Sequence, residues 1–415
     1  MIKTDQHIPE LRFPSYDTQW MVSRIEELFE FKNGLNKEKE FFGRGTPIIN
    51  FKDVYNLSGI YAKNLNGLVE LSSSEIERYS AQKGDVFFTR TSETIHDIGM
   101  SAALMEDIEN CVFSGFVLRA RPISNQLSND FKMFCFNIYP VRKEIVTKSS
   151  FTTRALTSGT LLKKVIIKYP ASLPEQQKIA DFLSTVDKKI QALEKKKALL
   201  EQYKKGVMQK IFKQEIRFKQ EDGSDYREWV EKRLGDIVTF SKGKGISKSD
   251  IELEATNPCI RYGELYTQYG EVIDNVVSHT NLQKEGLVLS EANDLIIPSS
   301  GETNIDIATA SCVLYDGIIL GGDLNIIKSK MNGVFLAYYM NSHLRLEIAK
   351  YGQGVSVVHL YSSHLKLLKL LVPSLNEQTK IANSLSAIDD KIKVVTIQID
   401  KMKLWKKGLL QQMFV

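Results

Sequence analysis

At 415 residues the chain is too long for one ordinary hydrophobic core, because domains usually run to about 100 to 200 residues. Hydrophobic residues make up 43% of the sequence and charged residues 25%, which is typical of a folded protein and excludes a disordered one. The net charge of +5 is mildly basic and does not by itself identify a partner.

The first residues, the cysteines and the histidines predict a cytoplasmic protein without a metal site. Met1 to Asp5 lacks the apolar core of a signal peptide, and no apolar run approaches the roughly 18 residues of a membrane span, so we expect no membrane partner. His359 and His364 are five residues apart, which is the wrong spacing for one helix face. The cysteines lie far apart among apolar neighbours and are expected to be buried thiols in a reducing compartment: Cys111, Cys135, Cys259 and Cys312.

The first globular segment, residues 1–172, contains a turn, a buried strand and a polar loop between Gly84 and Ser92. A second polar stretch, Thr152 to Gly159, precedes the final strand of this segment. Phe31 to Gly34 forms a further segment that contains a lysine and a glycine. We expect one mixed α/β domain here.

A long helix is predicted over residues 173–213, because apolar residues recur there with a heptad spacing. A helix of this kind would be roughly 60 Å long and would expose an apolar seam, so it requires a partner helix. The predicted seam consists of Ile179, Leu183, Val186, Ile190, Leu193 and Leu200.

The second globular segment, residues 214–374, repeats the skeleton of the first. Arg12-Phe13 and Trp20 match Arg217-Phe218 and Trp229, and Phe31 to Gly34 resembles Phe240 to Gly243. Asn293 to Gly301 has the pattern of Gly84 to Ser92. The glycines of Ser241 to Gly245 either form a turn or present backbone amides to a phosphate, and the sequence leaves both readings open.

A second long helix is predicted over residues 375–415, and it repeats the first. Leu173 to Phe212 aligns without a gap to Leu375 to Phe414, with 16 of 40 positions identical. These two stretches carry net charges of +4 and +3, so the positive potential of the chain is concentrated in them. The seam of the second helix consists of Ile381, Leu385, Ile388, Ile392, Val395 and Ile399.

Three lysines, Lys197, Lys204 and Lys406, interrupt the core positions of the heptads. Their long stems can extend out of an ordinary two-helix seam into water. Alternatively, they can face DNA phosphates or another subunit.

The doubled helix signature carries a family resemblance. Each copy contains Leu-x-Glu-Gln-x-Lys-Ile-Ala-x-x-Leu-Ser and Lys-Lys-Gly, beginning at Leu173 and Leu375, after a domain with the turn, strand and polar loop described above. The whole chain resembles a specificity subunit of a type I restriction-modification system. Asn376 departs from the pattern, since the first copy has Pro174 at that position.

The resemblance implies an α+β fold, in which two tandem mixed α/β target-recognition domains are each followed by a long helix, and the helices form an antiparallel coiled coil. It implies that each domain reads half of a split site in double-stranded DNA and that the helices set the spacer and dock other subunits. Those partners would be two modification subunits and two restriction subunits. We expect no cofactor on this chain itself, with S-adenosylmethionine, ATP and magnesium on the partner subunits.

Base recognition requires forked donors and acceptors on loops that enter the major groove. The polar loops after the buried strands and before the final strands meet this requirement, and basic residues near the glycines can contact the DNA backbone. The candidate DNA contacts are Lys32, Arg90, Thr91, Ser92, Arg154 and Ser158 in the first domain, and Lys242, Lys244, Ser299, Ser300, Asn304 and Gln353 in the second.

The sequence lacks the common signatures of a catalytic chain. It contains no GxxxxGK[ST] phosphate loop and no Pro-Pro pair of the kind found in amino-methyltransferase motifs, so we expect a subunit that is not itself an enzyme. Two other hypotheses stay open at this point. One is a lysine-rich coiled-coil scaffold that binds no specific DNA sequence, and the other is a fused methyltransferase or nuclease with an unrecognised site.

Overall fold

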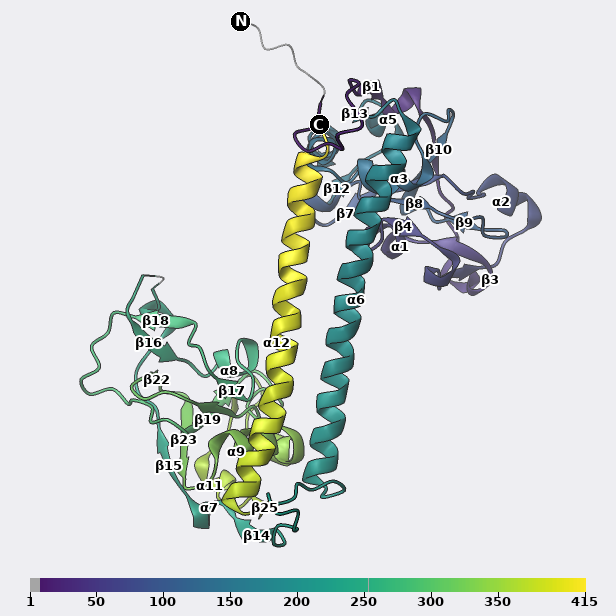
Figure 1. Cartoon of the computed structure of the whole chain (residues 1–415). Helices are drawn as coiled ribbons and strands as arrows, with labels where there is room; N and C mark the ends of the chain where they lie inside the picture. The colour runs from purple at the N-terminus through teal and green to yellow at the C-terminus, as the bar shows by residue number, and fades with distance from the viewer. Residues whose placement is uncertain (1–7, 253) are drawn as a thin grey trace, which may run out of the picture. The chain divides into compact units, whose positions relative to one another are not determined.

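The computed structural model describes residues 8–252 and 254–415 and divides into two compact units. Unit 1 comprises Met1–Leu193 with Gln398–Val415, and unit 2 comprises Glu194–Ile397. Each unit therefore contains one globular part and a segment of each long helix, α6 (Leu173–Phe212) and α12 (Leu375–Gln412), which Figure 1 shows as uninterrupted helices. Met1 to Asp5, on which the signal-peptide expectation rests, lies outside the described residues.

Unit 1 is built on a five-stranded sheet. In spatial order its strands are β2 (Phe29–Asn33), β10 (Val117–Pro122), β6 (Val86–Thr89), β8 (Ser101–Leu104) and β4 (Gly59–Ile60). The central strand β6 is antiparallel to both neighbours, and all of its residues are buried. This burial explains why its sequence, Val-Phe-Phe-Thr, does not alternate between apolar and polar residues.

Smaller sheets and short helices complete unit 1. The sheets are β5 (Leu68–Val69) with β3 (Phe42–Ile49) and β9 (Val112–Phe113), β11 (Ser150–Phe151) with β12 (Ala155–Leu156) and β7 (Thr91–Ser92), and β1 (Met21–Arg24) with β13 (Ile166–Tyr169). The helices are α1 (Phe51–Tyr55), α2 (Ser73–Arg78), α3 (Asn129–Cys135), α4 (Tyr139–Lys148) and α5 (Gly159–Leu162). Single 3-10 turns lie at Ile25–Glu27, Lys39–Phe41, Ala62–Asn64 and Ile95–Asp97.

Unit 2 repeats this order of strands. Its five-stranded sheet runs β15 (Val238–Lys242), β23 (Leu324–Ser329), β19 (Leu295–Pro298), β21 (Ser311–Val313) and β17 (Val272–Ile273). The smaller sheets are β18 (Ser278–Thr280) with β16 (Asn257–Ile260) and β22 (Ile319–Leu320), β20 (Ser300–Gly301) with β24 (Val358–His359), and β14 (Val230–Arg233) with β25 (Lys369–Val372). The parallel edge pairs recur too, β4 with β8 in unit 1 and β17 with β21 in unit 2.

The helices of unit 2 follow the same plan. They are α7 (Leu234–Ile237), α8 (Glu264–Thr267), α9 (Gly333–Tyr339), α10 (Arg345–Lys350) and α11 (Ser362–Leu365), with a 3-10 turn at Lys248–Asp250 and a π-helical turn at Met340–Leu344. Strands β6 and β19 occupy the same central place in their sheets, so the sequence match between Gly84 to Ser92 and Asn293 to Gly301 is a match between equivalent strands. Both segments begin with a left-handed residue, Gly84 at φ 91° and Asn293 at φ 80°.

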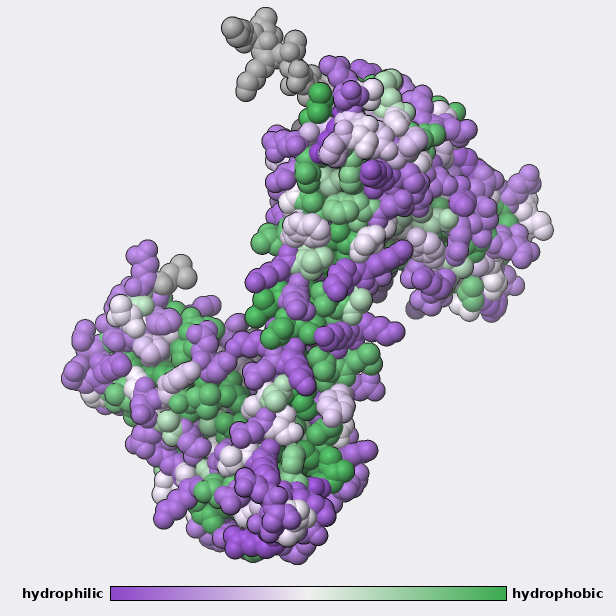
Figure 2. Space-filling view, in the orientation of Figure 1, coloured by the Kyte–Doolittle hydropathy of each residue, from purple (hydrophilic) through white to green (hydrophobic). Residues whose placement is uncertain are grey.

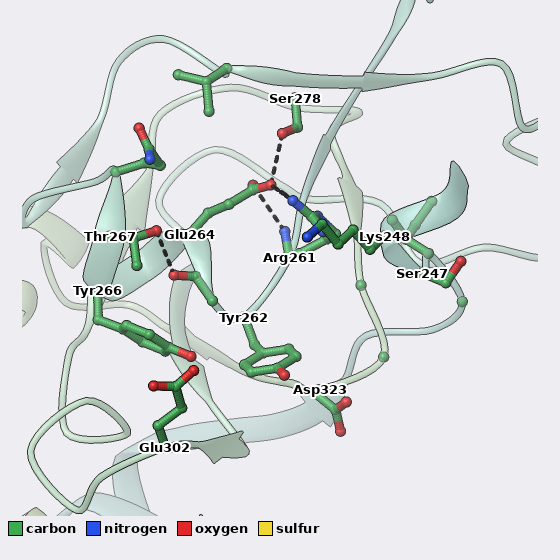
Figure 3. A pocket seen from close by; sticks show the side chains of 17 residues that line it. Ser247, Lys248, Arg261, Tyr262, Glu264, Tyr266, Thr267, Ser278, Glu302 and Asp323 are labelled. Atoms are coloured by element: carbon green, nitrogen blue, oxygen red, sulfur yellow. Dashed lines mark hydrogen bonds and ion pairs between the residues drawn. The ribbon is translucent and has the colours of Figure 1, made fainter. Parts of the chain in front are cut away.

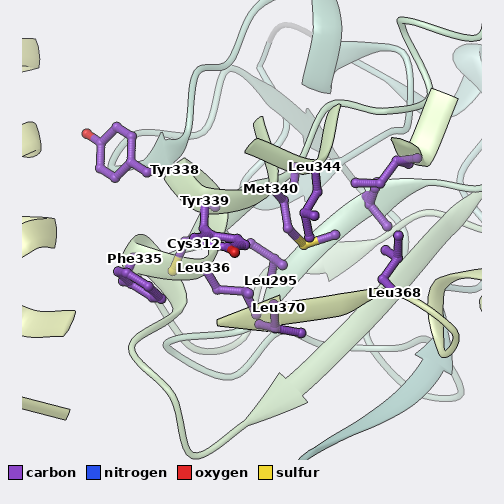
Figure 4. Close-up of a cluster of buried hydrophobic side chains, with 14 of the residues drawn as sticks. Leu295, Cys312, Phe335, Leu336, Tyr338, Tyr339, Met340, Leu344, Leu368 and Leu370 are labelled. Atoms are coloured by element: carbon purple, nitrogen blue, oxygen red, sulfur yellow. The ribbon is translucent and has the colours of Figure 1, made fainter. Parts of the chain in front are cut away.

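The hydrophobic core of each unit lies between the five-stranded sheet, its helices and the long helices. In unit 2 the aromatic and aliphatic residues of α9, β19 and β25 pack together (Figure 4). Ile381, Leu385 and Ile388 of α12 belong to the same core. In unit 1 the corresponding core joins α3 to Ile179 and Leu183 of α6. The long helices are thus part of the domain cores and are not appended to them.

Contacts within each unit show that the two long helices run antiparallel. In unit 1 the first half of α6 shares a core with Leu409 and Met413 near the end of α12. In unit 2 Met208 and Ile211, near the end of α6, share a core with Ile381 near the beginning of α12. These findings confirm the α+β fold class, with two tandem domains and a pair of contacting helices.

The predicted seam lies on the inner side of these helices. Ten of its twelve residues are buried, and the other two, Leu200 and Ile392, are half-buried. Docking of other subunits on the seam, as distinct from packing within the chain, stays a prediction.

The Glu-Gln pair of the repeated signature links each long helix to its domain. Glu175 accepts two hydrogen bonds from the Arg12 guanidinium, at 2.7 and 2.9 Å, and Glu377 accepts two from Arg217, both at 3.2 Å. Both carboxylates are completely buried. A buried carboxylate held by a forked guanidinium is a strong, directional contact, so it fixes the beginning of the helix against the chain that precedes the domain.

The adjacent glutamines act on the other side of the same junction. Gln176 accepts a hydrogen bond from the amide of Ser128, at 2.8 Å, and Gln378 accepts one from the amide of Asn332, at 2.9 Å. Ser128 and Asn332 are the N-cap residues of α3 and α9. Each glutamine therefore connects the first turn of a long helix to the first turn of a core helix.

The cysteines are buried free thiols, as predicted from their neighbours. Burial raises the pKa of Cys111 and of Cys312 to about 12. Within the described ranges, no group of three or more metal-binding side chains comes together. No helix among the described residues has the length and apolar character that a membrane crossing requires.

Glu175→Gln is expected to lower the free energy of unfolding by about 3 kcal/mol, because the Arg12 guanidinium would lose the charge that balances it in a buried place. Urea denaturation measures this change. Glu231→Gln is the matched control, since the Glu231–Lys369 pair is 59% exposed on both sides and should contribute less than about 1 kcal/mol. Equal effects of the two substitutions would contradict the role given to Glu175.

Candidate functional site

The polar loops predicted at two distant places in each domain lie next to each other in the structure. In unit 1, Thr91 and Ser92 form strand β7, which pairs with β12 just after Arg154. In unit 2, Ser300 and Gly301 form β20, which pairs with His359 and Val358 of β24. The segment after the central strand and the segment before the final strand therefore form one surface in each unit.

Unit 1 has a hollow of about 390 Å³ on this surface. Three of the predicted residues line it, namely Thr91, Ser92 and Arg154, and they share it with aromatic side chains, including the exposed Phe116. Arg90 is half-buried beside this hollow, and its amide donates to the carbonyl of Phe116.

The remaining predicted residues of unit 1 are engaged within the domain. Ser158 is the N-cap of α5, where its hydroxyl accepts a hydrogen bond from the amide of Leu161 at 3.3 Å. The Lys32 ammonium donates to the carbonyl of Arg78 and lies 5.9 Å from the centre of the Tyr79 ring. Burial and the nearby Arg119 lower the pKa of Lys32.

In unit 2 the predicted residues divide by exposure. Ser299 and Ser300 are only 5% exposed, because the chain around them pairs with β24. Asn304 is exposed, as is Gln353, whose backbone forms both hydrogen bonds of a bridge to His359. Lys242 and Lys244 are exposed on the segment that contains Gly243.

Gly34 and Gly243 occupy equivalent positions, and both positions require glycine for the same structural reason. A side chain on Gly34 would lie 2.0 Å from the carbonyl oxygen of Ser114, and one on Gly243 would lie 1.9 Å from that of Gly321. The amides of Gly243 and Lys244 donate to the carbonyls of Leu324 and Leu320. These two amides are therefore used inside the domain, and the glycine allows two backbone segments to approach closely.

Unit 2 has a larger hollow, of about 720 Å³, which is shown in Figure 3. Glu302 of the predicted loop lines it, together with Tyr262, Tyr266 and Asp323. On the opposite wall Glu264 is paired with Arg261 at 2.9 Å and accepts a hydrogen bond from the Ser278 hydroxyl at 2.7 Å. The wall also contains Ile246, a β-branched residue held in the left-handed conformation at φ 59°, where such residues are rare.

Sequence reasoning did not single out the aromatic residues of these hollows. In unit 1 they are Phe116 and, on α1, Phe51 and Tyr55, whose rings stack at 5.5 Å, and in unit 2 they are Tyr262 and Tyr266. The two segments, Asn50-Phe-Lys-Asp-Val-Tyr55 and Arg261-Tyr-Gly-Glu-Leu-Tyr266, align without a gap. This recurrence of an aromatic pair around one acidic residue was the signal that could have located them.

The lysines at heptad core positions are paired inside the chain. Lys204 forms ion pairs with Asp389 at 2.7 Å and Glu271 at 2.9 Å, and Lys406 pairs with Asp187 at 2.5 Å. Lys204 and Lys406 are equivalent in the repeat, and so are Asp389 and Asp187. Lys197 lies 3.9 Å from Glu201 of its own helix and is 34% exposed. Lys204 and Lys406 therefore stabilise the contact between the helices in each unit.

The outer sides of the long helices carry exposed apolar residues between charged ones. They include Leu199 and Tyr203 of α6, and Val394, Ile397 and Leu404 of α12, all of which are more than 40% exposed. Figure 2 shows hydrophobic and hydrophilic side chains interspersed along these helices. Exposed apolar residues that are scattered among polar ones are normal in folded proteins, so these side chains alone do not identify a binding surface.

A family model described as "Type I restriction modification DNA specificity domain" matches the chain twice, over residues 18–202 and 226–402. Two proteins of Methanocaldococcus jannaschii are each 25% identical to the chain. They are the putative type I restriction enzyme MjaX specificity subunit, over 94% of this chain and 92% of that protein, and the type I restriction enzyme MjaIX specificity subunit, over 95% and 92%.

Solved structures share the fold. The S subunit of a type I restriction-modification system from M. genitalium aligns with a TM-score of 0.59 at 17% identity, over 98% of this chain and 99% of that one. A chain from a structural study of assembly and conformational transition in a type I R-M system aligns with a TM-score of 0.56 at 14% identity, over 95% and 97%.

Gly243→Ala is expected to destabilise the protein by about 2 kcal/mol or more, because the added carbon would overlap backbone atoms that cannot move aside. Gly408→Ala is the matched control. Gly408 lies inside α12 with nothing within 4 Å of an added carbon, so alanine should stabilise the helix by about 0.5 to 1 kcal/mol. Thermal unfolding of both variants checks this, and an unchanged melting temperature for Gly243→Ala would show that the close approach is dispensable.

Proposed function

The chain belongs to the family of type I restriction-modification DNA specificity domains, and we propose that it recognises a two-part DNA site on behalf of such a complex. The observation that carries this proposal is the duplication itself. The family model matches two segments, and each segment forms a unit with the same order of strands.

Each unit is proposed to read one half of an asymmetric site in double-stranded DNA. The exposed polar side chains next to the paired strands β7 and β12 in unit 1, such as Arg154, and next to β20 and β24 in unit 2, such as Asn304, would supply donors and acceptors for base edges. Exposed lysines such as Lys242 and Lys244 would contact phosphates, which contribute affinity without sequence preference.

The chain is proposed to recognise DNA and to leave the chemistry to its partners. Its relatives are specificity subunits of type I restriction enzymes. The partners would be two modification subunits, which bind S-adenosylmethionine, and two restriction subunits, which use ATP and magnesium, all acting in the cytoplasm. We propose that α6 and α12 also dock these subunits, with exposed apolar residues on their outer sides, such as Leu199 and Leu404, among the contacts.

The long helices are proposed to fix the number of base pairs between the half-sites. Each runs without a break for 40 or 38 residues, and the beginning of each is anchored by a buried Glu-Gln pair. A continuous helix has a defined length of about 1.5 Å per residue, so it can transmit a distance that a flexible linker cannot. The alternative of a scaffold without DNA specificity is disfavoured by the family membership of both units.

Exchanging residues 1–172 for the equivalent segment of a relative should change one half of the recognised site and leave the other half and the spacer unchanged. The reason is that each unit has its own core and its own polar surface. Mapping the methylated adenines in DNA modified by the assembled complex measures both halves at once. A change in both halves would show that the units do not read independently.

Deleting one heptad from each long helix, residues 194–200 and 393–399, should shorten the preferred spacer by about three base pairs or abolish site recognition, because seven helical residues span roughly 10 Å. The same mapping experiment gives the spacer length. Circular dichroism should first show that the helical content survives. A folded variant that keeps the original spacer with full activity would refute the proposal that the helices set it.

A further inference from the structure

One short segment recurs in both units at a place where the polar loops also lie. Asn50 to Tyr55 and Arg261 to Tyr266 each follow a strand of the three-stranded sheet, β3 in unit 1 and β16 in unit 2. Each contains an aromatic residue, an acidic residue two positions later, a buried aliphatic residue and a tyrosine. The recurrence indicates that both units use this segment for the same purpose.

The local structure of the two segments is similar, although α1 begins at Phe51 and α8 begins at Glu264. Asp53 accepts a hydrogen bond from the amide of Asn50 at 2.8 Å, and Glu264 accepts one from the amide of Arg261 at 3.2 Å. Val54 and Leu265 are completely buried. The acidic residue and the aliphatic residue thus hold the helical turn against the core, and the two aromatic residues line the hollow of their unit.

The hollow of unit 2 presents hydrogen-bond acceptors. Figure 3 shows the Glu302 carboxylate beside the Tyr266 ring and the Asp323 carboxylate near Tyr262. Arg261 does not neutralise these carboxylates, because its guanidinium is paired with Glu264. Within residues 8–252 and 254–415, the Glu302 and Asp323 side chains and the hydroxyls of both tyrosines form no hydrogen bond or ion pair.

Lys248 also lines the hollow, but Glu302 and Asp323 together outweigh its single positive charge, so the hollow does not favour a phosphate of the DNA backbone. The two carboxylates suit a group that donates hydrogen bonds. In the major groove such donors are the exocyclic amino groups of adenine and cytosine, whereas guanine and thymine present oxygen acceptors at the corresponding place. Phenol hydroxyls can donate or accept, and they add contacts to the same base edge.

We propose that the hollow bounded by Tyr262, Tyr266, Glu302 and Asp323 reads one base of the second half-site and selects an amino base, adenine or cytosine, on the contacted strand. This inference rests on the proposed function, and it assigns to these four residues a step of recognition within it. The hollow of unit 1 also contains two carboxylates, Glu93 and Asp97, but Asp97 accepts a hydrogen bond from the Thr94 hydroxyl at 2.7 Å and Arg154 adds a donor that suits guanine, so its half-site should not share this preference.

The test uses the full chain assembled with its modification subunits and a DNA library that is randomised at both half-sites. Bound DNA is recovered and sequenced, so the readout is binding preference and does not depend on methyl transfer. Glu302→Gln replaces an acceptor by an amide that can also donate to guanine or thymine. The ratio of amino to keto bases should fall at least about fivefold at one position of the second half-site.

Two control substitutions match the two kinds of change. Glu285→Gln removes a charge from an exposed glutamate of unit 2 that does not line the hollow, and it should leave the preference unchanged. Tyr262→Phe with Tyr266→Phe should weaken the preference at the same position as Glu302→Gln, whereas Tyr315→Phe, at a 52% exposed tyrosine outside the hollow, should not. The substituted side-chain groups form no hydrogen bonds with the part of the chain that the structure describes, so the melting temperatures should stay close to that of the unsubstituted protein.

The inference is overturned if Glu302→Gln keeps the original preference at every position, or if its effect is spread evenly over both half-sites. It is supported if the change is confined to one position of the second half-site. A complex of the unsubstituted chain that selects no sequence at all would count instead against the proposed function. The two failures are therefore distinguishable in the same experiment.

Discussion

The contact on which the rest of the structure depends is the buried carboxylate at the beginning of each long helix. Glu175 and Glu377 are completely buried, and each receives a forked pair of hydrogen bonds from an arginine that precedes its domain in the sequence. A buried carboxylate without a cation would be strongly unfavourable, so helix, domain and preceding chain must come together for either unit to fold. The adjacent glutamines, bonded to the N-caps of α3 and α9, fix the orientation of this junction.

Ion pairs inside the chain also account for part of the positive charge of the long helices. Lysine-rich stretches attract polyanions in general, and the net charge of the two helices is consistent with that. Yet Lys204 and Lys406, the lysines that interrupt the seam, are used for ion pairs with Asp389 and Asp187 inside the chain. These pairs recur because the helices are antiparallel copies of one sequence, so each lysine meets the aspartate of the other copy.

The two units share the same order of strands and the same backbone contacts, and they differ in the side chains that line their hollows. Close backbone approaches at Gly34 and Gly243, and the capped turns at Asp53 and Glu264, recur almost unchanged. Both hollows next to these turns combine aromatic rings with carboxylates, but the first adds Phe116 and Arg154, whereas the second adds Lys248 and the ion pair of Arg261 with Glu264. Exposed side chains that line such hollows usually affect stability little when they are replaced, so recognition can change while the fold is kept.

The sequence by itself determined the duplication, the two long helices and the seam residues, because heptad spacing and a gapless repeat are local patterns that survive without knowledge of distant contacts. It also located the strand that precedes each polar loop. Only the tertiary structure decided which polar residues are available for binding. Ser299 and Ser300 are buried where the chain pairs with β24, Ser158 caps a helix, and Lys32 donates to a backbone carbonyl. Thr91 and Arg154, in contrast, line the same hollow although 62 residues separate them in the sequence. Exposure depends on partners that are remote in sequence, and no local pattern encodes them.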